Sequence, residues 1–247
     1  MKMTGNTIFI TGGGTGIGQA LAIAFHTLGN KVIIAGRREA PLAETAKAHP
    51  GMDYRTFDTR NASSIAEAAD WLVMTHPEVN VLINNAGIMS SDNTGGFMDD
   101  DLTVATIETN LLGPMRLTSA LIEHLKTRPD AVLANVTSGL AFTPLANSAV
   151  YSATKAALHS WTLSLRYRLR GTSVRVLEVA PPWVQTDLMG GRDEPRAMPL
   201  RDFIDETMRS FASGADEVLV ERVKALRDNP GPNEWEFVEK FNDLLAH

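Results

Sequence analysis

Apolar residues along this chain fall into two patterns that alternate from the N-terminus onward. Short apolar runs rich in β-branched residues predict strands that are buried on both faces. We expect such strands at residues 7–10, 32–35, 54–57, 79–83, 131–136 and 174–179. Longer segments between them carry apolar residues at helical spacing, and we expect helices that end near residue 28 or span residues 102–125 and 151–170. Strands that alternate with helices in this way favour a parallel sheet covered on both faces.

The order of these elements predicts a doubly wound α/β fold of the Rossmann type, formed by the whole chain as a single domain of residues 1–247. A Pro-, Gly- and Met-rich stretch begins at Pro181, and we expect residues 181–213 to form a substrate loop. A short strand at residues 218–220 and a terminal helix from Glu234 complete the prediction. The three acids at 99–101 are expected to begin the helix of residues 102–125, where carboxylates bond free N–H groups.

Composition removes several classes of function. The net charge of −6 argues against a nucleic-acid partner, because binding to phosphates needs clustered Lys and Arg. The chain has no cysteine, which excludes disulfides, thiolate metal sites and cysteine nucleophiles. Its six histidines show no metal-binding spacing, so no metal is expected. The sequence shows neither a secretory signal nor an apolar run long enough to span a membrane, and we expect a cytoplasmic protein.

A glycine-rich turn lies between the first predicted strand and the first predicted helix. It reads Thr11-Gly12-Gly13-Gly14-Thr15-Gly16-Ile17-Gly18. Glycines at this position let the backbone approach a pyrophosphate at a helix N-terminus. A merely flexible loop would explain neither this location nor the helix that follows. The turn therefore predicts a dinucleotide site.

The second strand indicates which dinucleotide binds. Sites for NAD commonly have a carboxylate near the end of this strand, whereas this chain reads Arg37-Arg38 there. Guanidinium groups suit the 2′-phosphate of NADP(H) in both charge and geometry. The competing interpretation is that one arginine merely begins the next helix in solvent. We expect NADP(H), with Arg37 as the main contact.

Tyr151 and Lys155 are four residues apart, which places them on one face of a helix. A free tyrosine titrates near ~10, and a neighbouring positive charge favours the phenolate. Ser138, at the end of the fifth predicted strand, can bring a hydroxyl to the same place. Together with the glycine-rich turn, these residues predict proton transfer at a carbonyl or an alcohol.

With these motifs in this order, the chain resembles the short-chain dehydrogenase/reductase family over residues 7–186. Its ending and its Pro181-Pro182-Trp183 segment resemble a branch often labelled as lipoteichoic-acid D-alanylation oxidoreductases. The resemblance implies that Tyr151 is the general acid, that Ser138 polarises the substrate oxygen, and that Lys155 binds the nicotinamide ribose and lowers the tyrosine pKa. It also implies that Asn110, before Gly113-Pro114, holds a water in a proton relay to Lys155.

The same resemblance assigns further contacts to the cofactor, with Asp58 and Thr59 at the adenine and Val184 and Thr186 at the nicotinamide. The implied contacts are Gly12, Gly14, Thr15, Gly16, Ile17, Gly18, Arg37, Arg38, Asp58, Thr59, Asn85, Ala86, Gly87, Pro181, Val184 and Thr186. One departure lies at position 182, where the family usually has glycine and this chain has proline. Because proline has no N–H, a backbone contact is not expected there.

The reaction expected from the resemblance is NADPH-dependent reduction of a small-to-medium, apolar ketone or aldehyde, and the reverse oxidation of an alcohol. Leu140, Trp183, Leu188 and Met189 are the predicted substrate contacts, although ordinary packing would also explain them. A non-catalytic NADP(H)-sensing regulator is the alternative function, and an epimerase or dehydratase fits less well because no second domain follows.

We expect a homodimer through the helices that carry Asn110 and Tyr151, the usual dimer face of the family. The apolar residues expected on that face are Met115, Leu121, Leu158, Trp161 and Leu165. A homotetramer is also open, although the C-terminal Asp-Gly-Gly signature of tetrameric members is absent.

Overall fold

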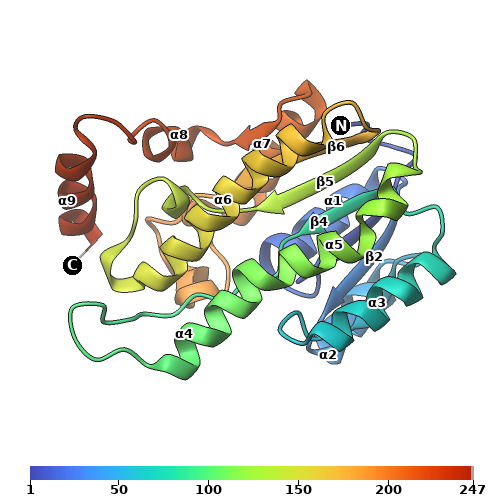
Figure 1. Cartoon of the computed structure of the whole chain (residues 1–247), viewed down its shortest axis with the longest axis horizontal. Helices are drawn as coiled ribbons and strands as arrows, with labels where there is room; N and C mark the ends of the chain where they lie inside the picture. The colour runs from blue at the N-terminus through green and yellow to red at the C-terminus, as the bar shows by residue number, and fades with distance from the viewer. Residues whose placement is uncertain (246–247) are drawn as a thin grey trace.

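Seven parallel strands form one sheet in the order β3-β2-β1-β4-β5-β6-β7 (Figure 1). The computed structural model describes residues 1–245, without the side chains of Met189 and Arg192. The strands are β1 (Thr7–Thr11), β2 (Lys31–Gly36), β3 (Asp53–Thr56), β4 (Val81–Asn84), β5 (Ala131–Val136), β6 (Val174–Ala180) and β7 (Glu217–Leu219). Strand order reverses between β1 and β4, which confirms the predicted doubly wound fold.

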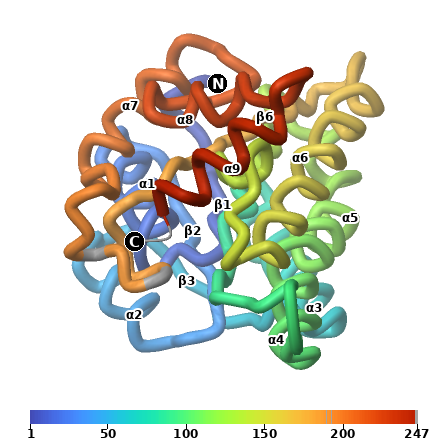
Figure 2. Tube along the Cα trace, turned by 90° about the vertical axis from the view of Figure 1, so that its left-hand side faces the viewer, coloured from blue at the N-terminus to red at the C-terminus, as the bar shows by residue number. Residues whose placement is uncertain are grey.

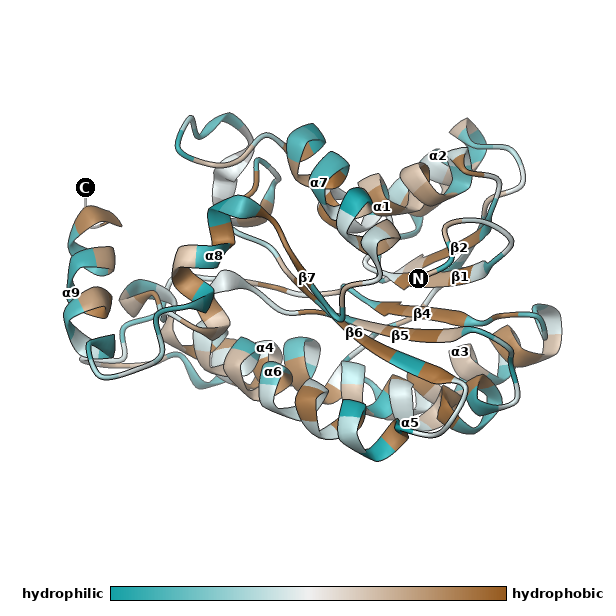
Figure 3. Cartoon of the chain, turned by 90° about the horizontal axis from the view of Figure 1, so that it is seen from above, coloured by the Kyte–Doolittle hydropathy of each residue, from teal (hydrophilic) through white to brown (hydrophobic). Residues whose placement is uncertain are grey.

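Helices cover both faces of the sheet (Figure 3). On one face lie α1 (Gly16–Thr27), α2 (Glu39–Ala48) and α7 (Leu200–Ser213), and on the other lie α3 (Ala62–Thr75), α4 (Asp100–Ile107), α5 (Gly113–Lys126) and α6 (Ala149–Leu169). Strand residues alternate between the two layers: Ile8 and Ile10 pack in one apolar core and Phe9 in the other. Both layers are apolar, which is why the strands read as unbroken apolar runs.

The predicted helix over residues 102–125 is interrupted. A π-helical segment, Glu108–Leu112, joins α4 to α5 and contains Asn110. The residue four positions after Asn110 is Pro114, which has no N–H, so the α-helical bond to the Asn110 carbonyl cannot form. The acids before this helix behave as predicted, since Asp99 accepts a hydrogen bond from the N–H of Leu102 at 3.0 Å.

The segment of residues 181–213 is only partly a loop. Val184 forms a parallel bridge with Met198, and a short 3₁₀ helix spans Leu188–Asp193. The second half is α7, whose Phe203 and Phe211 are completely buried in the core. The prediction of a substrate loop therefore applies at most to residues 181–199.

The C-terminal part adds β7, then α8 (Glu221–Arg227) and α9 (Glu234–Leu245). Figure 2 looks onto the edge of the sheet where the strands end, and α9 lies across it. Asn242 of α9 donates to the carbonyl of Pro144 at 3.0 Å, which ties α9 to the segment after β5. Among residues 1–245, no helix is long and apolar enough to cross a membrane.

Two of the residues expected on a dimer face lie elsewhere. Leu121 and Leu158 are each only 1% exposed and pack inside the chain's own core. Leu121 packs in the same apolar layer as the strand residues Leu82 and Leu133. The large apolar residues exposed on α4 and α6 are instead Val104, Ile107, Leu163 and Tyr167.

Candidate active site

The turn between β1 and α1 is held against the segment that follows β4. The Thr11 hydroxyl accepts hydrogen bonds from the N–H groups of Asn85 and Ala86, both at 3.0 Å. The Asn85 amide in turn donates to the Thr11 carbonyl at 2.9 Å. A Cβ at Gly18 would lie 2.3 Å from this amide and 2.4 Å from the Gly12 carbonyl oxygen, so no larger residue fits. Gly12 itself has φ of 67°, the left-handed region that glycine tolerates.

The N-terminus of α1 opens toward the same edge. Thr15 precedes the helix, and its side chain makes no capping hydrogen bond. The first N–H groups of a helix have no partner within it, and they attract anions. A Cβ at Gly16 would lie 3.5 Å from the Thr186 methyl group, so the predicted pyrophosphate turn adjoins one predicted nicotinamide contact. Gly14, by contrast, faces Leu42 of α2 and serves the packing of that helix.

Arg37 and Arg38 follow β2 and are exposed. In the described part of the chain neither guanidinium forms an ion pair. Asp58 accepts hydrogen bonds from Arg60, which are the main reason that its pKa lies below the usual range, and the charge of Arg37 lowers it further. Arg37 therefore lies near Asp58, at the end of β3. Thr59, the second predicted adenine contact, is buried.

Ser138 and Tyr151 meet at the end of β5. A hydrogen-bonding interaction with Ser138 lowers the pKa of the Tyr151 phenol, so the two side chains lie close together, and each residue is 7% exposed. Ser138 Oγ also accepts a hydrogen bond from the N–H of Leu140 at 3.1 Å. Thus Ser138 is oriented from its own loop and from the first turn of α6.

Burial is the largest influence on the two titratable groups. It raises the pKa of Tyr151 to about 12, against which the hydrogen bond with Ser138 acts. Burial also lowers the pKa of Lys155 to about 8. Lys155 Nζ lies 5.6 Å from the centre of the Tyr151 ring, one helical turn away as the spacing predicts. In the protein alone the tyrosine pKa is thus raised by burial, not lowered by Lys155 as the resemblance implied.

Lys155 and Asn110 adjoin at the backbone of Gly87. A Cβ on Gly87 would lie 3.4 Å from Asn110 Oδ1 and 3.6 Å from Lys155 Nζ. Asn110 accepts from the Ile88 N–H at 2.9 Å and donates to the Ile88 carbonyl at 2.8 Å. Its side chain therefore holds the segment after β4 in place, and the structure brings Asn110, Lys155 and Tyr151 to one edge of the sheet.

A pocket of about 360 Å³ opens beside Tyr151. It lies between the segment after β4 and the start of α4 and α6. Its lining consists of Ser90, Ser91, Asp92, Asn93, Phe97, Asp99, Leu102, Thr103, Thr106, Val150 and Tyr151. Of the predicted substrate contacts whose side chains are described, Leu140, Trp183 and Leu188, none is in this lining.

Three of the four predicted substrate contacts can be placed. Leu140 adjoins Ser138, and Leu188 is exposed. The Trp183 ring lies 5.4 Å from the guanidinium of Arg196, within the segment of residues 181–199. The side chain of Met189 lies outside the described part. Pro181 accepts a hydrogen bond from the Gly139 N–H at 2.8 Å, so its carbonyl supports the Ser138 loop. Val184 is buried at the bridge to Met198.

Sequence reasoning missed Asp92. Its Oδ2 accepts a hydrogen bond from the N–H of Val150 at 2.8 Å, in the first turn of α6 and next to Tyr151. Its Oδ1 is buried and has no hydrogen-bond partner among the described residues. The available signal was its place after β4, because β4 and β5 are neighbours and their carboxyl ends share one edge.

Known proteins resemble this chain along nearly all its length. A family model described as short chain dehydrogenase matches residues 6–197. DltE of Bacillus subtilis (strain 168), described as an uncharacterized oxidoreductase, is 43% identical over 238 residues, which cover 92% of this chain and 93% of that protein.

Solved structures of short-chain dehydrogenases and related enzymes have the same fold as this chain. A short chain dehydrogenase from Burkholderia cenocepacia J2315, in complex with NADP, has a TM-score of 0.85 and 26% identity, and the match covers 97% of this chain and 98% of that one. The closed form of a serine dehydrogenase complexed with NADP⁺ has a TM-score of 0.77 and 26% identity, with coverage of 83% and 88%.

Proposed function

This chain belongs to the short-chain dehydrogenase family, and we propose that it is an NADPH-dependent carbonyl reductase that also works in reverse as an alcohol dehydrogenase. The observation that carries the proposal is that Ser138 and Tyr151 are buried next to each other beside the 360 Å³ pocket. A proton donor and a second hydroxyl that lie side by side can both hydrogen-bond to the oxygen of one carbonyl group.

In the proposed mechanism, the substrate lies in the pocket with its carbonyl oxygen at Ser138 and Tyr151. When bound, a nicotinamide cofactor would supply the hydride. The Ser138 hydroxyl donates a hydrogen bond to the oxygen as negative charge develops there. The Tyr151 phenol, which its raised pKa keeps protonated at neutral pH, gives the oxygen its proton. Lys155 lies beside both Tyr151 and Asn110. From this side a proton can return to the Tyr151 phenolate.

NADP(H) is the proposed cofactor. The open N-terminus of α1 fits a pyrophosphate, and the close-packed glycines at positions 12 and 18 hold the turn before it against the segment after β4. Arg37 and Arg38, free of ion pairs within residues 1–245, fit a 2′-phosphate. The NADP complexes of the relatives from Burkholderia cenocepacia and of the serine dehydrogenase support this choice.

The proposed substrate is a small-to-medium, uncharged ketone or aldehyde with an apolar body. Phe97, Leu102 and Val150 give the pocket apolar wall, and its two charged residues, Asp92 and Asp99, are both acids. Because no basic residue lines the pocket, a carboxylate or phosphate on the substrate would lack a partner. Leu140, Trp183, Leu188 and Met189 remain proposed contacts on the side of the 181–199 segment.

We further propose a homodimer through α4 and α6, where exposed apolar side chains gather. A non-catalytic sensor of NADP(H) would need neither the buried Ser138–Tyr151 pair nor a pocket next to it, and we therefore favour the enzyme.

The decisive experiment is a panel of ketones, aldehydes, sugars and phosphorylated carbonyls, with NADPH and with NADH, followed by loss of nicotinamide absorbance. We expect turnover of neutral aromatic or aliphatic carbonyls, with NADPH preferred. Binding of NADPH without turnover of any of these compounds would instead support the sensor.

A further inference from the structure

Glu178 is a buried acid on β6, the strand beside the edge strand β7. It lies on β6 between the fully buried apolar residues Leu177 and Val179, and its own side chain is 1% exposed. Burying a carboxylate costs free energy unless partners compensate, and an apolar residue would be at least as stabilising at such a place. Stability alone therefore does not explain an acid at position 178.

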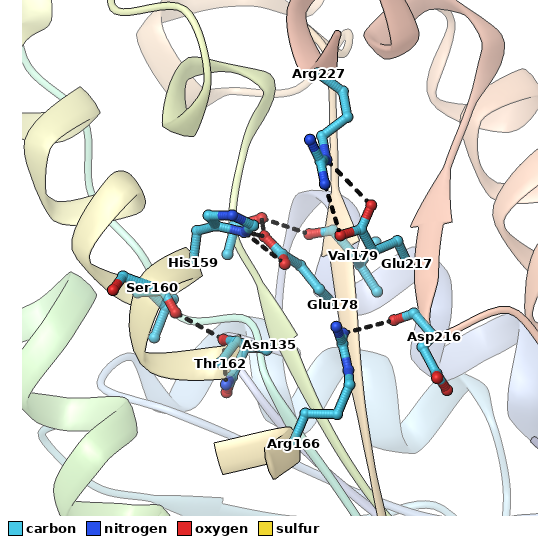
Figure 4. Close-up of polar contacts among 12 residues, drawn as sticks. Asn135, His159, Ser160, Thr162, Arg166, Glu178, Val179, Asp216, Glu217 and Arg227 are labelled. Atoms are coloured by element: carbon cyan, nitrogen blue, oxygen red, sulfur yellow. Dashed lines mark hydrogen bonds and ion pairs between the residues drawn. The ribbon is translucent and has the colours of Figure 1, made fainter. Parts of the chain in front are cut away.

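The partners of Glu178 lead directly to the catalytic loop. Its Oε1 accepts a hydrogen bond from the Thr137 hydroxyl at 2.7 Å, and Thr137 immediately precedes Ser138. His159 Nδ1 lies 2.9 Å from Oε1 and 2.8 Å from Oε2 (Figure 4). Because a carboxylate can only accept, Nδ1 carries the proton of this contact.

His159 continues the catalytic face of α6. Tyr151, Lys155 and His159 follow one another at intervals of four residues, so they lie along one face over three turns.

Each of them reaches a different residue at the end of β5. Tyr151 lies against Ser138, which lowers the pKa of its phenol, and Lys155 Nζ donates to the carbonyl of Val136 at 2.9 Å. His159 reaches Thr137 through Glu178. Residues 136, 137 and 138 are thus all fixed to the same helix.

A second layer holds the other side of this loop. The Phe142 ring meets the His159 ring edge-on, with centres 4.9 Å apart. The Arg227 guanidinium lies 5.0 Å from the centre of the Phe142 ring and makes two hydrogen bonds of 3.1 Å to Glu217 (Figure 4). His159 therefore contacts the loop directly after Ser138, at Phe142, and is linked to it before Ser138 through Glu178.

We infer that Glu178 and His159 are positioning residues, which fix Ser138 against Tyr151 by holding Thr137 and Phe142. The inference rests on the proposed function, in which Ser138 donates a hydrogen bond to the substrate oxygen. A displacement of about 1 Å can lower a rate by about 100-fold, so a small shift of this loop is enough to matter.

The test is a double-mutant cycle. Glu178→Ala is expected to lower kcat for carbonyl reduction by roughly 10- to 100-fold, with the Kd for NADPH within about twofold of wild type. In a Ser138→Ala background, the same change is expected to lower kcat by less than about threefold, because the residue through which Glu178 acts is gone. An equal loss in both backgrounds would overturn the inference.

Two further variants separate positioning from general damage. Glu178→Gln keeps the side-chain shape and an acceptor for Thr137, and is expected to recover most of kcat. If Glu178→Ala does not fold, His159→Phe is put through the same cycle. Arg166→Gln is the matched control: Arg166 bonds the same helix to the carbonyl of Val176, which pairs with Leu133 and not with residues 136–138, and to that of Asp216, which also accepts from the Glu178 N–H; kcat should not change. Full kcat in both the Glu178 and the His159 variants would also refute the inference.

Hydrogen exchange makes the test independent of turnover. The amides of Gly139, Ala141 and Phe142, which are hydrogen-bonded within or beside the loop, should exchange at least several-fold faster in Glu178→Ala than in Arg166→Gln. If the wild type reduces no carbonyl, the proposed function fails, and exchange still decides whether the pair holds the loop. Equal exchange in these two variants would contradict that role.

Discussion

The ammonium of Lys155 donates a hydrogen bond to the carbonyl oxygen of Val136 at 2.9 Å, at the end of the strand that leads to Ser138. This contact joins the helix of the proposed acid to the strand of the hydroxyl that assists it. It also explains how a lysine is held inside the protein, since its charge has a fixed acceptor. Lys155 is therefore both a structural contact between α6 and β5 and a buried group with a lowered pKa.

Tyr151→Phe should remove nearly all turnover. The phenol is the proposed proton donor, and general acid catalysis typically contributes about 10²- to 10⁴-fold. We expect kcat to fall by at least about 10²-fold while the Kd for NADPH, measured by fluorescence titration, changes less than about threefold. Retained turnover would rule out Tyr151 as the acid.

Arg37→Ala should weaken binding of NADPH by roughly 10- to 100-fold, because a hydrogen bond to a charged group contributes about 1.5–3 kcal/mol. Binding of NADH, which has no 2′-phosphate, should change little. Arg38→Ala serves as the comparison, since Arg38 precedes α2 as its N-cap residue and is expected to have the smaller effect. If Arg37→Ala weakened the binding of NADH and of NADPH equally, Arg37 would not be the contact of the 2′-phosphate.

Stability should depend on pH through Lys155. Its pKa is about 8 in the folded protein and 10.5 as a free group, so between these values the unfolded chain binds a proton that the folded chain does not. Stability therefore rises with pH across this window, by an amount on the order of 3 kcal/mol. Below pH 8 the full cost of burying the ammonium is present.

Urea unfolding at several pH values checks this against Lys155→Met. The stability of the wild type relative to this variant should increase from pH 8 to pH 10. The comparison stops at pH 10, because above it the raised pKa of Tyr151 makes stability fall. A constant difference would mean that Lys155 is not buried with a lowered pKa.

Asp92→Ala should affect stability and catalysis together. It removes the hydrogen bond to the Val150 N–H, and the loss of an N-terminal cap costs about 1 kcal/mol. Because Val150 precedes Tyr151, we also expect kcat to fall several-fold. Asn61→Ala is the matched control, since Asn61 caps α3 through the Ser64 N–H at 3.0 Å. This control should lose stability alone, and unchanged kcat in Asp92→Ala would refute the link to Tyr151.

Ile107→Glu and Leu163→Glu should convert the proposed dimer into a monomer. Both side chains are exposed on α4 and α6, and a charge in an apolar interface lacks a partner. Light scattering at working concentration measures the mass of wild type and variants. Leu244→Glu on α9, which is also exposed, is the control and should leave the mass unchanged. A monomeric wild type would contradict the dimer.

Much of the fold follows from the sequence, because the signals are local. The buried strands appear as apolar runs, and the strand β5 is found at the residues predicted for it, Ala131–Val136. The glycine-rich turn and the four-residue spacing of Tyr151 and Lys155 are likewise readable, since each depends on residues close together in the chain. These features determine the fold class, the cofactor class and the candidate acid.

Other features depend on contacts between distant parts of the chain. Asp92 bonds to Val150, and Glu178 bonds to His159 and Thr137, only because β4, β5 and β6 lie side by side with α6 across them. Burial decides the rest: it places Leu121 and Leu158 in the core and raises the pKa of Tyr151. The sequence alone determined which chemical groups this protein carries in each element. Only the tertiary structure decided which of them meet and how far they are shielded from water, since both depend on long-range packing.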